Sequence, residues 1–388
     1  MLMSLPVVPE PGFVPVTNFM AYVTEECNLR CSYCFVNKQP RHMTMETARK
    51  MIDFCLQPLV SGQEPFLSIN FFGGEPLLRA EFLLELLTYI QERGADRFVL
   101  GATTNGTLAG DSVRRLVEEG QLHLLVSLDG DAASHQFRPK VSGTSSWDHV
   151  RRNLRRLISW APTTSIRMTY HPESLNLQEK VEAALEMGAR WIVLSPVVEA
   201  NWAGHERALW EQSRRLGDWF VREFERGQTP PLQHYWNWLL DYHAQFHGLE
   251  QRPAKACKLG TQLLAFDTAG NVLPCQRYLY RKHERLGNVL RDERLPPERD
   301  RYVHLSRAEI PDCHGCVARA VCGGGCRVLA QEAGLGQRTL DFLERDHIRA
   351  MDLQPVDKVL LEDGAQTVDV PADQTHLPWL LGLPFTSF

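Results

Sequence analysis

Three cysteines, Cys27, Cys31 and Cys34, constrain this 388-residue chain more than any other feature. Their spacing, C-x3-C-x2-C, places three thiolates on one tight loop, and no fourth cysteine lies nearby in the sequence. A 4Fe–4S cluster has four irons, each normally bound by a cysteine. Three ligands therefore leave one iron open to a group that is not protein. The alternatives are three buried thiols or a zinc loop, although zinc sites usually combine C-x2-C units with a second pair of ligands.

Composition and charge favour a cytoplasmic redox enzyme. Ten cysteines in an intracellular protein favour metal binding over disulfides. The net charge of −5 shows no basic excess of the kind that binds nucleic acid. Residues 1–19 have neither a basic start nor a long apolar run, so we expect no signal peptide and no membrane span. We therefore expect neither nucleic acid nor a membrane as a partner.

The first two hundred residues alternate between strand and helix patterns. Short β-branched and aromatic runs predict strands at 18–23, 66–72, 98–103, 122–127, 164–170 and 191–195. Helical periodicity predicts helices at 45–56, 77–93, 111–119, 146–159 and 178–187. This alternation predicts an α/β fold with a parallel sheet covered by helices. Six units fit a partial (β/α)6 barrel, whose active-site loops follow the C-terminal ends of the strands.

Polar and glycine-rich segments follow several of these predicted strands. Gly73 and Gly74 free the backbone to approach a ligand closely, and Glu75 can accept a hydrogen bond from an ammonium group. The alternative is a glycine turn followed by a carboxylate at a helix start. Later strand ends carry hydroxyl and carboxylate groups that suit sugar hydroxyls and a guanidinium that suits a carboxylate. These residues are Asn105, Ser127, Asp129 and Arg138.

A second set of cysteines lies between residues 257 and 326. Cys55 stands apart in a helical pattern with apolar neighbours, where a core thiol is the better interpretation. Zinc is the alternative for the second set, because C-x2-C units also build zinc ribbons. The set consists of Cys257, Cys275, Cys313, Cys316, Cys322 and Cys326.

Together, the cysteine loop, the Gly73-Gly74-Glu75 turn and the second set resemble radical S-adenosylmethionine (SAM) enzymes with a SPASM extension. The resemblance implies that Cys27, Cys31 and Cys34 hold a 4Fe–4S cluster whose open iron binds SAM. It also implies up to two auxiliary 4Fe–4S clusters. The implied SAM contacts are Tyr33, Phe35, Gly73, Gly74, Glu75, Asn105, Ser127, Asp129 and Arg138. The resemblance divides the chain into five parts: an N-terminal segment at 1–17, a barrel at 18–200, a helical bridge at 201–250, a SPASM domain at 251–350 and a tail at 351–388.

One departure from the family pattern concerns the auxiliary clusters. Carried over by resemblance, Cys257, Cys275 and Cys326 hold the first auxiliary cluster, and Cys313, Cys316 and Cys322 hold the second. A further cysteine usual in the family is absent, because none follows Cys326. Our hypothesis is that Asp346 is the missing ligand, with Glu344 and His347 as alternatives. A solvated, charged helix face explains that segment equally well.

The residues after Cys275 bear on the reaction. In sulfatase-maturating radical SAM enzymes an aspartate follows the equivalent cysteine and serves as base, whereas here Gln276 follows. The run Leu273–Tyr278, followed by Leu286-Gly287-Asn288, instead resembles the PCHRF…LGN run of peptide maturases. Those enzymes install thioether or carbon–carbon crosslinks in ribosomal precursor peptides. A small-molecule dehydrogenase, a sulfatase-type formylglycine-generating enzyme and a non-catalytic iron–sulfur carrier are the alternatives.

The resemblance also implies a mechanism and partners. One electron cleaves SAM to methionine and a 5′-deoxyadenosyl radical, which removes hydrogen from a ribosomal precursor peptide. The electron comes from an external donor of flavodoxin or ferredoxin type. About twenty residues precede the first predicted strand, too few for a leader-binding domain. We therefore expect leader recognition to need a separate leader-binding protein or another surface of this chain.

Overall fold

The computed structural model describes residues 15–62, 66–94, 97–197, 199–232, 259–292, 294–295, 297–299 and 302. These residues belong to two compact units. Unit 1 contains residues 15–30 and 34–125 together with the described residues from 259 to 302. Unit 2 contains residues 31–33 and the described residues from 126 to 232.

Unit 1 is built on a sheet with β1 inside it. The strands are β1 (Asn18–Thr24), β2 (Leu67–Gly73), β3 (Phe98–Thr104), β7 (Leu263–Phe266), β8 (Asn271–Leu273) and β9 (Gly287–Asn288). They follow the order β3-β2-β1-β7-β8-β9, parallel from β3 to β7 and antiparallel from β7 to β9. All seven residues of β1 are buried, as expected for a strand paired on both sides in a covered sheet.

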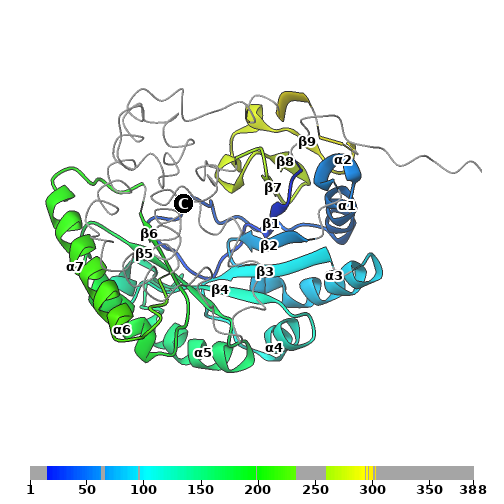
Figure 1. Cartoon of the computed structure of the whole chain (residues 1–388). Coiled ribbons are helices and arrows are strands. Elements are labelled where there is room, and N and C mark those ends of the chain that lie inside the picture. Colours follow the sequence, from blue (N-terminus) through cyan, green and yellow to red (C-terminus); the bar gives the residue numbers. More distant parts are fainter. Residues whose placement is uncertain are drawn as a thin grey trace, which may run out of the picture. The chain divides into compact units, whose positions relative to one another are not determined.

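Helices cover the sheet of unit 1. They are α1 (Met45–Cys55), α2 (Pro58–Ser61), the 3-10 helix η1 (Pro76–Arg79), α3 (Ala80–Glu92) and α4 (Asp111–Glu118). The Thr44 side chain caps α1 by accepting a hydrogen bond from the Thr47 backbone N–H at 3.1 Å. Phe54 of α1 packs edge-on against Phe266 of β7, with ring centroids 5.9 Å apart. In Figure 1, α3 runs alongside β3, and α3 packs against both α1 and α4.

Three short 3-10 helices follow β8 in unit 1. They are η4 (Gln276–Tyr278), η5 (Lys282–Glu284) and η6 (Pro297–Arg299). The segment between η5 and η6 returns to the sheet, because Leu286 N donates to Val272 O at 2.8 Å and Val289 N donates to Gly270 O at 2.9 Å. The Leu286-Gly287-Asn288 run singled out in the sequence therefore lies beside Gly270 and the strand that leads to Cys275.

Unit 2 continues the alternation of strands and helices. β4 (His123–Ser127) runs from unit 1 into unit 2, and Leu128 N then donates to Arg167 O of β5 at 3.0 Å. β5 pairs with β6 in parallel, and α6 packs against α7 (Figure 1). The elements are η3 (Ser134–Phe137), α5 (Trp147–Trp160), β5 (Ser165–Tyr170), α6 (Leu177–Glu186), β6 (Ile192–Pro196) and α7 (Glu206–Glu225).

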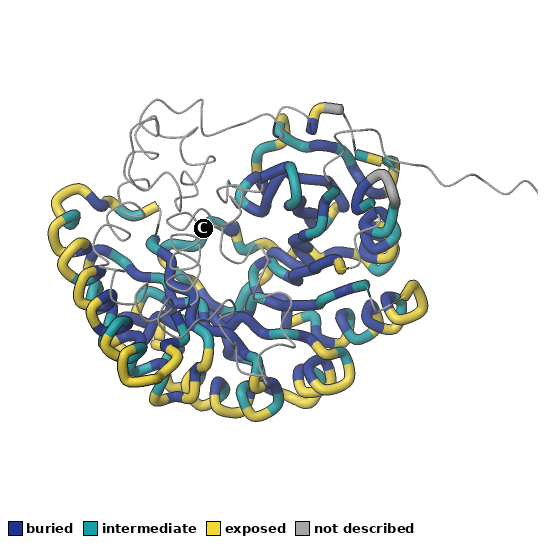
Figure 2. Tube along the Cα trace, in the orientation of Figure 1, coloured by how far each residue is buried: buried dark blue, intermediate teal, exposed yellow. Residues whose placement is uncertain are grey.

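The structure confirms the α/β class and the six successive β/α repeats expected from the sequence. Each predicted strand is present with ends within one residue of the expected ones. The helix predicted at 77–93 begins with the 3-10 turn η1, and the α-helix proper begins at Ala80. Figure 2 shows why these patterns could be recognised in the sequence, since the strands are mostly buried and the helices expose one face. Within the described part of the chain, no helix is long and apolar enough to span a membrane.

Candidate active site

The predicted cluster segment begins just after β1, and its first cysteine receives hydrogen bonds from N–H groups. Leu29 N lies 3.4 Å from Cys27 Sγ, and Asn105 Nδ2 lies 3.7 Å from the same sulfur. N–H donors to cysteine sulfur are the contacts that tune iron–sulfur clusters in proteins. The surroundings of Cys27 therefore fit an iron-bound thiolate.

The cysteines differ in exposure. Cys27, Cys31 and Cys34 are half-buried, whereas Cys55 is fully buried in α1, as expected for a core thiol. No group of three or more His, Cys, Asp or Glu side chains is gathered around a single point among the residues that the structure describes. In a 4Fe–4S cluster each thiolate binds a different iron, so cluster ligands need not converge on one point. The ligand role of the three cysteines stays a prediction.

Gly73 and Gly74 allow a close approach between two backbone segments. Gly74 N donates to Thr24 O at 2.9 Å, and Glu75 N donates to Glu26 O at 2.8 Å. A Cβ atom on Gly73 would lie 1.9 Å from Thr24 O, and Gly73 has a φ of +140° that L side chains rarely adopt. A Cβ atom on Gly74 would lie 2.1 Å from Glu26 O. The glycines therefore bring the turn against the residues that lead into Cys27.

Glu75 is fully buried, and its carboxylate is occupied by donors from unit 1. Its Oε1 accepts from Leu77 N at 3.0 Å and Thr104 Oγ1 at 2.8 Å, and its Oε2 accepts from Asn105 N at 2.6 Å. Burial raises the pKa of Glu75 to about 7, and the three hydrogen bonds oppose that rise. Glu75 thus connects the glycine turn to the end of β3 through hydrogen bonds. Its contact with SAM stays a prediction.

Asn105 connects this turn to the segment at residues 27–34, called the cysteine segment below. Its Nδ2 donates to Asn28 Oδ1 at 2.8 Å, while its Oδ1 accepts from both the backbone N–H and the hydroxyl of Thr107. The Asn28 side chain in turn donates to Thr107 Oγ1 at 2.8 Å. Asn105 is 7% exposed and lies beside Cys27, which is consistent with its predicted place at the site.

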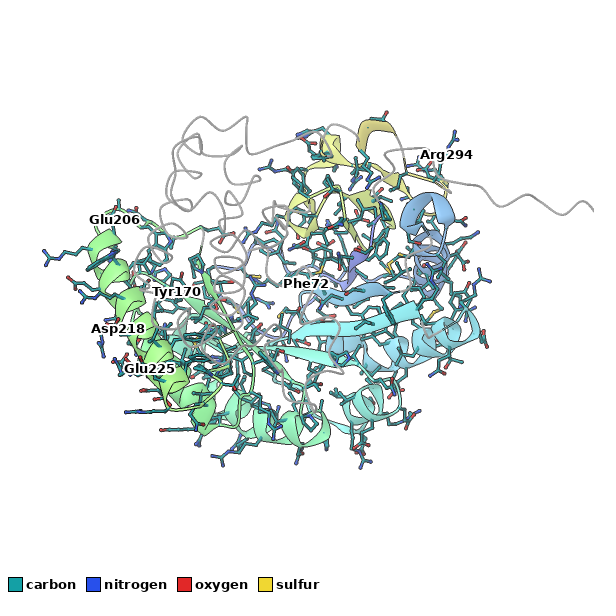
Figure 3. The ribbon with its side chains drawn as sticks, viewed as in Figure 1. Phe72, Tyr170, Glu206, Asp218, Glu225 and Arg294 are labelled. Carbon is teal, nitrogen blue, oxygen red and sulfur yellow. The ribbon has the colours of Figure 1, made fainter. Side chains whose placement is uncertain are left out.

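Phe35 belongs to an aromatic cluster in unit 1. Its ring stacks on Phe72, with centroids 6.2 Å apart, and Phe72 is labelled at the end of β2 in Figure 3. Tyr22 packs edge-on against Phe72 at 5.3 Å. The Arg277 guanidinium lies 5.0 Å from the centroid of Phe35, within the range of a cation–π interaction. The predicted contact between Phe35 and SAM is not tested by this packing.

Asp129 is the centre of a buried network in unit 2. Arg138 donates to it from Nε at 2.8 Å and from Nη2 at 3.0 Å. The Tyr33 hydroxyl donates to it at 2.5 Å, and Thr169 N donates at 3.0 Å. Burial opposes the charge on Asp129, but the Arg138 guanidinium and these donors hold its pKa below the usual value. Both oxygens of Asp129 are therefore used by side chains and backbone of this unit.

Arg138 and Ser127 were predicted to contact SAM. Arg138 is 6% exposed, its Nε and Nη2 contact Asp129, and its guanidinium lies 5.2 Å from the centroid of the Tyr33 ring. Ser127 is buried at the C-terminal end of β4. The structure thus brings Tyr33, Asp129 and Arg138 together, and their binding to SAM stays a prediction.

Sequence reasoning missed two buried polar side chains in unit 2, of which His135 supports the loop of Arg138. His135 Nε2 lies 3.0 Å from Ser146 Oγ, which donates to Arg138 O at 2.6 Å. Burial lowers the pKa of His135 to about 4, so the ring is neutral. Lys180 Nζ donates to Ser174 O at 2.5 Å, and burial lowers the pKa of Lys180 to about 8. Lysine is rarely buried and histidine is intermediate in burial, and no local pattern marks these two as internal.

Most of the second cysteine set lies outside the described residues. Cys275 is described and is 6% exposed, directly after β8. The side chain of Gln276 is buried beside it, and the Gln276 backbone oxygen accepts a hydrogen bond from Tyr22 at 2.9 Å. The predicted ligands outside the described residues are Cys257, Cys313, Cys316, Cys322, Cys326 and Asp346, together with the alternatives Glu344 and His347.

Comparison with known proteins identifies the domain that carries these features. Residues 21–187 match the model of the radical SAM superfamily. The serine-type anaerobic sulfatase-maturating enzyme of Klebsiella aerogenes is 24% identical, over 85% of this chain and 84% of its own. The solved structure of anSMEcpe with bound AdoMet and Cp18Cys peptide has a TM-score of 0.73 at 17% identity, covering 90% of this chain and 99% of that chain. SuiB of Streptococcus suis bound to precursor peptide SuiA has a TM-score of 0.57 at 16% identity, covering 84% and 74%.

The two structural likenesses show the fold and confirm the α/β radical SAM barrel predicted from the sequence. The likeness extends well beyond the matched domain, over nine-tenths of this chain in the case of anSMEcpe. Residues 21–187 are therefore a radical SAM domain, and the chain that carries this domain is an enzyme.

Proposed function

We propose that this enzyme modifies a side chain of a ribosomal precursor peptide, forming a thioether or carbon–carbon crosslink or a related oxidation product. When bound, SAM and its 4Fe–4S cluster supply a 5′-deoxyadenosyl radical that removes a hydrogen atom from the substrate. Two relatives support a peptide substrate, since anSMEcpe and SuiB were both solved with peptides bound. An external donor of flavodoxin or ferredoxin type provides the electron.

In this proposal, the residues of this chain bind and orient the cofactor. Cys27, Cys31 and Cys34 hold the cluster, and the N–H donors around Cys27 Sγ are contacts of the kind that tune a bound iron–sulfur cluster. The auxiliary clusters are held by the second cysteine set, of which Cys275 is described. The Asp129 carboxylate keeps the Arg138 guanidinium protonated, so Arg138 can donate hydrogen bonds to the carboxylate of a bound amino acid moiety.

The presence of Gln276, rather than an acidic residue, after Cys275 is the observation that favours crosslinking over formylglycine formation. Gln276 stands directly after Cys275, is 3% exposed, and its Oε1 has no hydrogen-bond partner among the residues that the structure describes. A carboxylate at this position could take a proton from the substrate, but an amide has no basic group at neutral pH. The chain therefore lacks at position 276 the base expected for formylglycine formation. A substrate radical that closes onto a neighbouring side chain fits this residue better.

Formylglycine formation on a sulfatase is the second candidate. It is favoured by the Klebsiella aerogenes sulfatase-maturating enzyme, whose similarity extends over 85% of this chain. That candidate requires another group of this chain to replace the missing carboxylate. A Gln276→Asp variant tests the two candidates against each other. It supplies the carboxylate that formylglycine formation requires, and its side chain is shorter by only one methylene.

Mass spectrometry of a co-expressed peptide tests the proposal. The enzyme would be expressed without oxygen alongside any short peptide encoded next to its gene, with Cys27→Ala as the inactive control. We expect the peptide to lose two hydrogens and fragmentation to assign this loss to a crosslink. The modified peptide should not react with hydroxylamine, because a crosslink contains no aldehyde. An aldehyde trapped by hydroxylamine, on this peptide or on a sulfatase peptide, would instead support formylglycine formation. An unchanged mass with no deuterium uptake from heavy water would contradict both candidates.

A further inference from the structure

A single hydroxyl group in unit 1 connects the two ends of the cysteine segment. Asn37 N, three residues after Cys34, donates to the Tyr280 hydroxyl oxygen at 2.8 Å. The same oxygen lies 3.1 Å from Glu25 Oε2, two residues before Cys27. We propose that Tyr280 is a positioning residue that holds the cysteine segment in place through this bridge.

The charge and burial of Glu25 determine where the hydroxyl proton of Tyr280 lies. Tyr280 could donate to Glu25 Oε2 at 3.1 Å or to Asn37 O at 3.3 Å. A carboxylate is the stronger acceptor, and Glu25 is only 3% exposed, so it needs donors. Arg41 supplies one at 3.4 Å, although its side chain is largely exposed. Tyr280 therefore donates to Glu25 while it accepts from Asn37.

Tyr280 belongs to the segment that also carries Cys275, and this segment contacts the cysteine region at further points. Gln276 O accepts from Tyr22 of β1 at 2.9 Å, and the Arg277 guanidinium lies over the Phe35 ring. Two of these contacts involve backbone atoms, at Gln276 and at Asn37. The segment after Cys275 thus contacts side chains before Cys27 and the backbone at Asn37 after Cys34, so the position of the cysteine segment depends on it.

This inference goes beyond the proposed function, because it concerns how the thiolates are held rather than which peptide is modified. It predicts that the cysteine segment loosens when the hydroxyl of Tyr280 is removed, even in a chain without iron. Catalytic activity is not needed to observe that change. An error about the substrate would therefore leave the test intact.

Hydrogen–deuterium exchange of the full chain, isolated without iron or SAM, is the first test. Tyr280→Phe removes the bridge and keeps the ring. Tyr89→Phe is the matched control, because the Tyr89 hydroxyl also binds a carboxylate, Asp53, at 2.8 and 2.9 Å, but on α3 away from the cysteine segment. We expect the amides of residues 26–36 to exchange about tenfold faster in Tyr280→Phe and at the wild-type rate in Tyr89→Phe. Equal exchange in the two variants would overturn the proposal.

Glu25→Gln provides a second variant, with the size of the side chain kept and the charge removed. We expect it to raise exchange over the same residues by a smaller factor, since the amide oxygen still accepts a hydrogen bond. After anaerobic reconstitution, the iron of Tyr280→Phe should pass to a chelator several-fold faster than that of Tyr89→Phe. Equal rates of iron loss in the two variants would count against the proposal. If the wild-type chain binds no iron, the assignment of a cluster to the cysteines is wrong, and the hydrogen–deuterium exchange result alone decides the proposal.

Discussion

Replacing Gly74 by alanine should displace the backbone that leads into Cys27. The new Cβ atom would lie 2.1 Å from Glu26 O and 2.6 Å from Glu25 O. Real Cβ atoms essentially never come within 3.0 Å of such atoms, so the two segments must separate by about 0.9 Å. Because the contacted atoms are backbone, no side chain can rotate to make room.

The expected cost follows from the contacts that this movement breaks. Overpacking of a tight site costs about 1–3 kcal/mol. The hydrogen bonds from Gly74 N to Thr24 O and from Glu75 N to Glu26 O are stretched at the same time, and each contributes about 1 kcal/mol. We therefore expect Gly74→Ala to lower the free energy of unfolding by about 3 kcal/mol.

Equilibrium urea unfolding of the full chain at pH 7, followed by circular dichroism, measures this loss. Gly110→Ala is the control, because none of the described residues comes within 4 Å of a Cβ atom placed there and the backbone of Gly110 is extended. Gly110 precedes α4, so its replacement should cost about 1 kcal/mol or less. Equal losses in the two variants would mean that the glycine turn yields easily, and would refute the reasoning.

Further predictions concern buried charges. The pKa of Glu75, raised to about 7 by burial, means that the folded chain binds this proton more tightly than the unfolded chain. Stability that is full below pH 4.5 is therefore lost as the pH rises through 7, and Glu75→Gln should remove roughly 2 kcal/mol of the difference in unfolding free energy between pH 5 and pH 8. Asp129→Asn leaves Arg138 buried without its counter-charge, which should cost about 3–5 kcal/mol in urea unfolding. Glu211→Gln, which breaks the exposed pair with Arg207, should change little, and equal losses in these two variants would contradict the buried role of Asp129.

The β/α repeats were predictable because their signals are local. Each strand is a short apolar run between turn residues, and each helix repeats its apolar positions along one face. The strands β7, β8 and β9 were not predicted. They are only two to four residues long, and β1 orders them from far away in the sequence.

The sequence identified which residues belong to the candidate site better than it identified their contacts. Gly73 and Gly74 were assigned to the site from their place after a strand, but the sequence could not show that the backbone before Cys27 is what approaches them. Asp129 and Arg138 were expected to face a ligand, and the structure pairs them with each other. The bridge between Glu25 and Tyr280 joins residues 255 positions apart, which no local pattern reveals.

Formation of 5′-deoxyadenosine tests the central claim most directly. The reconstituted chain would be incubated anaerobically with SAM and dithionite, and the products separated by chromatography. We predict that the wild type and Cys55→Ala form 5′-deoxyadenosine, because Cys55 is a buried core thiol. Variants with alanine at Cys27, Cys31 or Cys34 should form none. Product from any of those three variants, or none from the wild type, would contradict the assignment of this chain's radical chemistry to these cysteines.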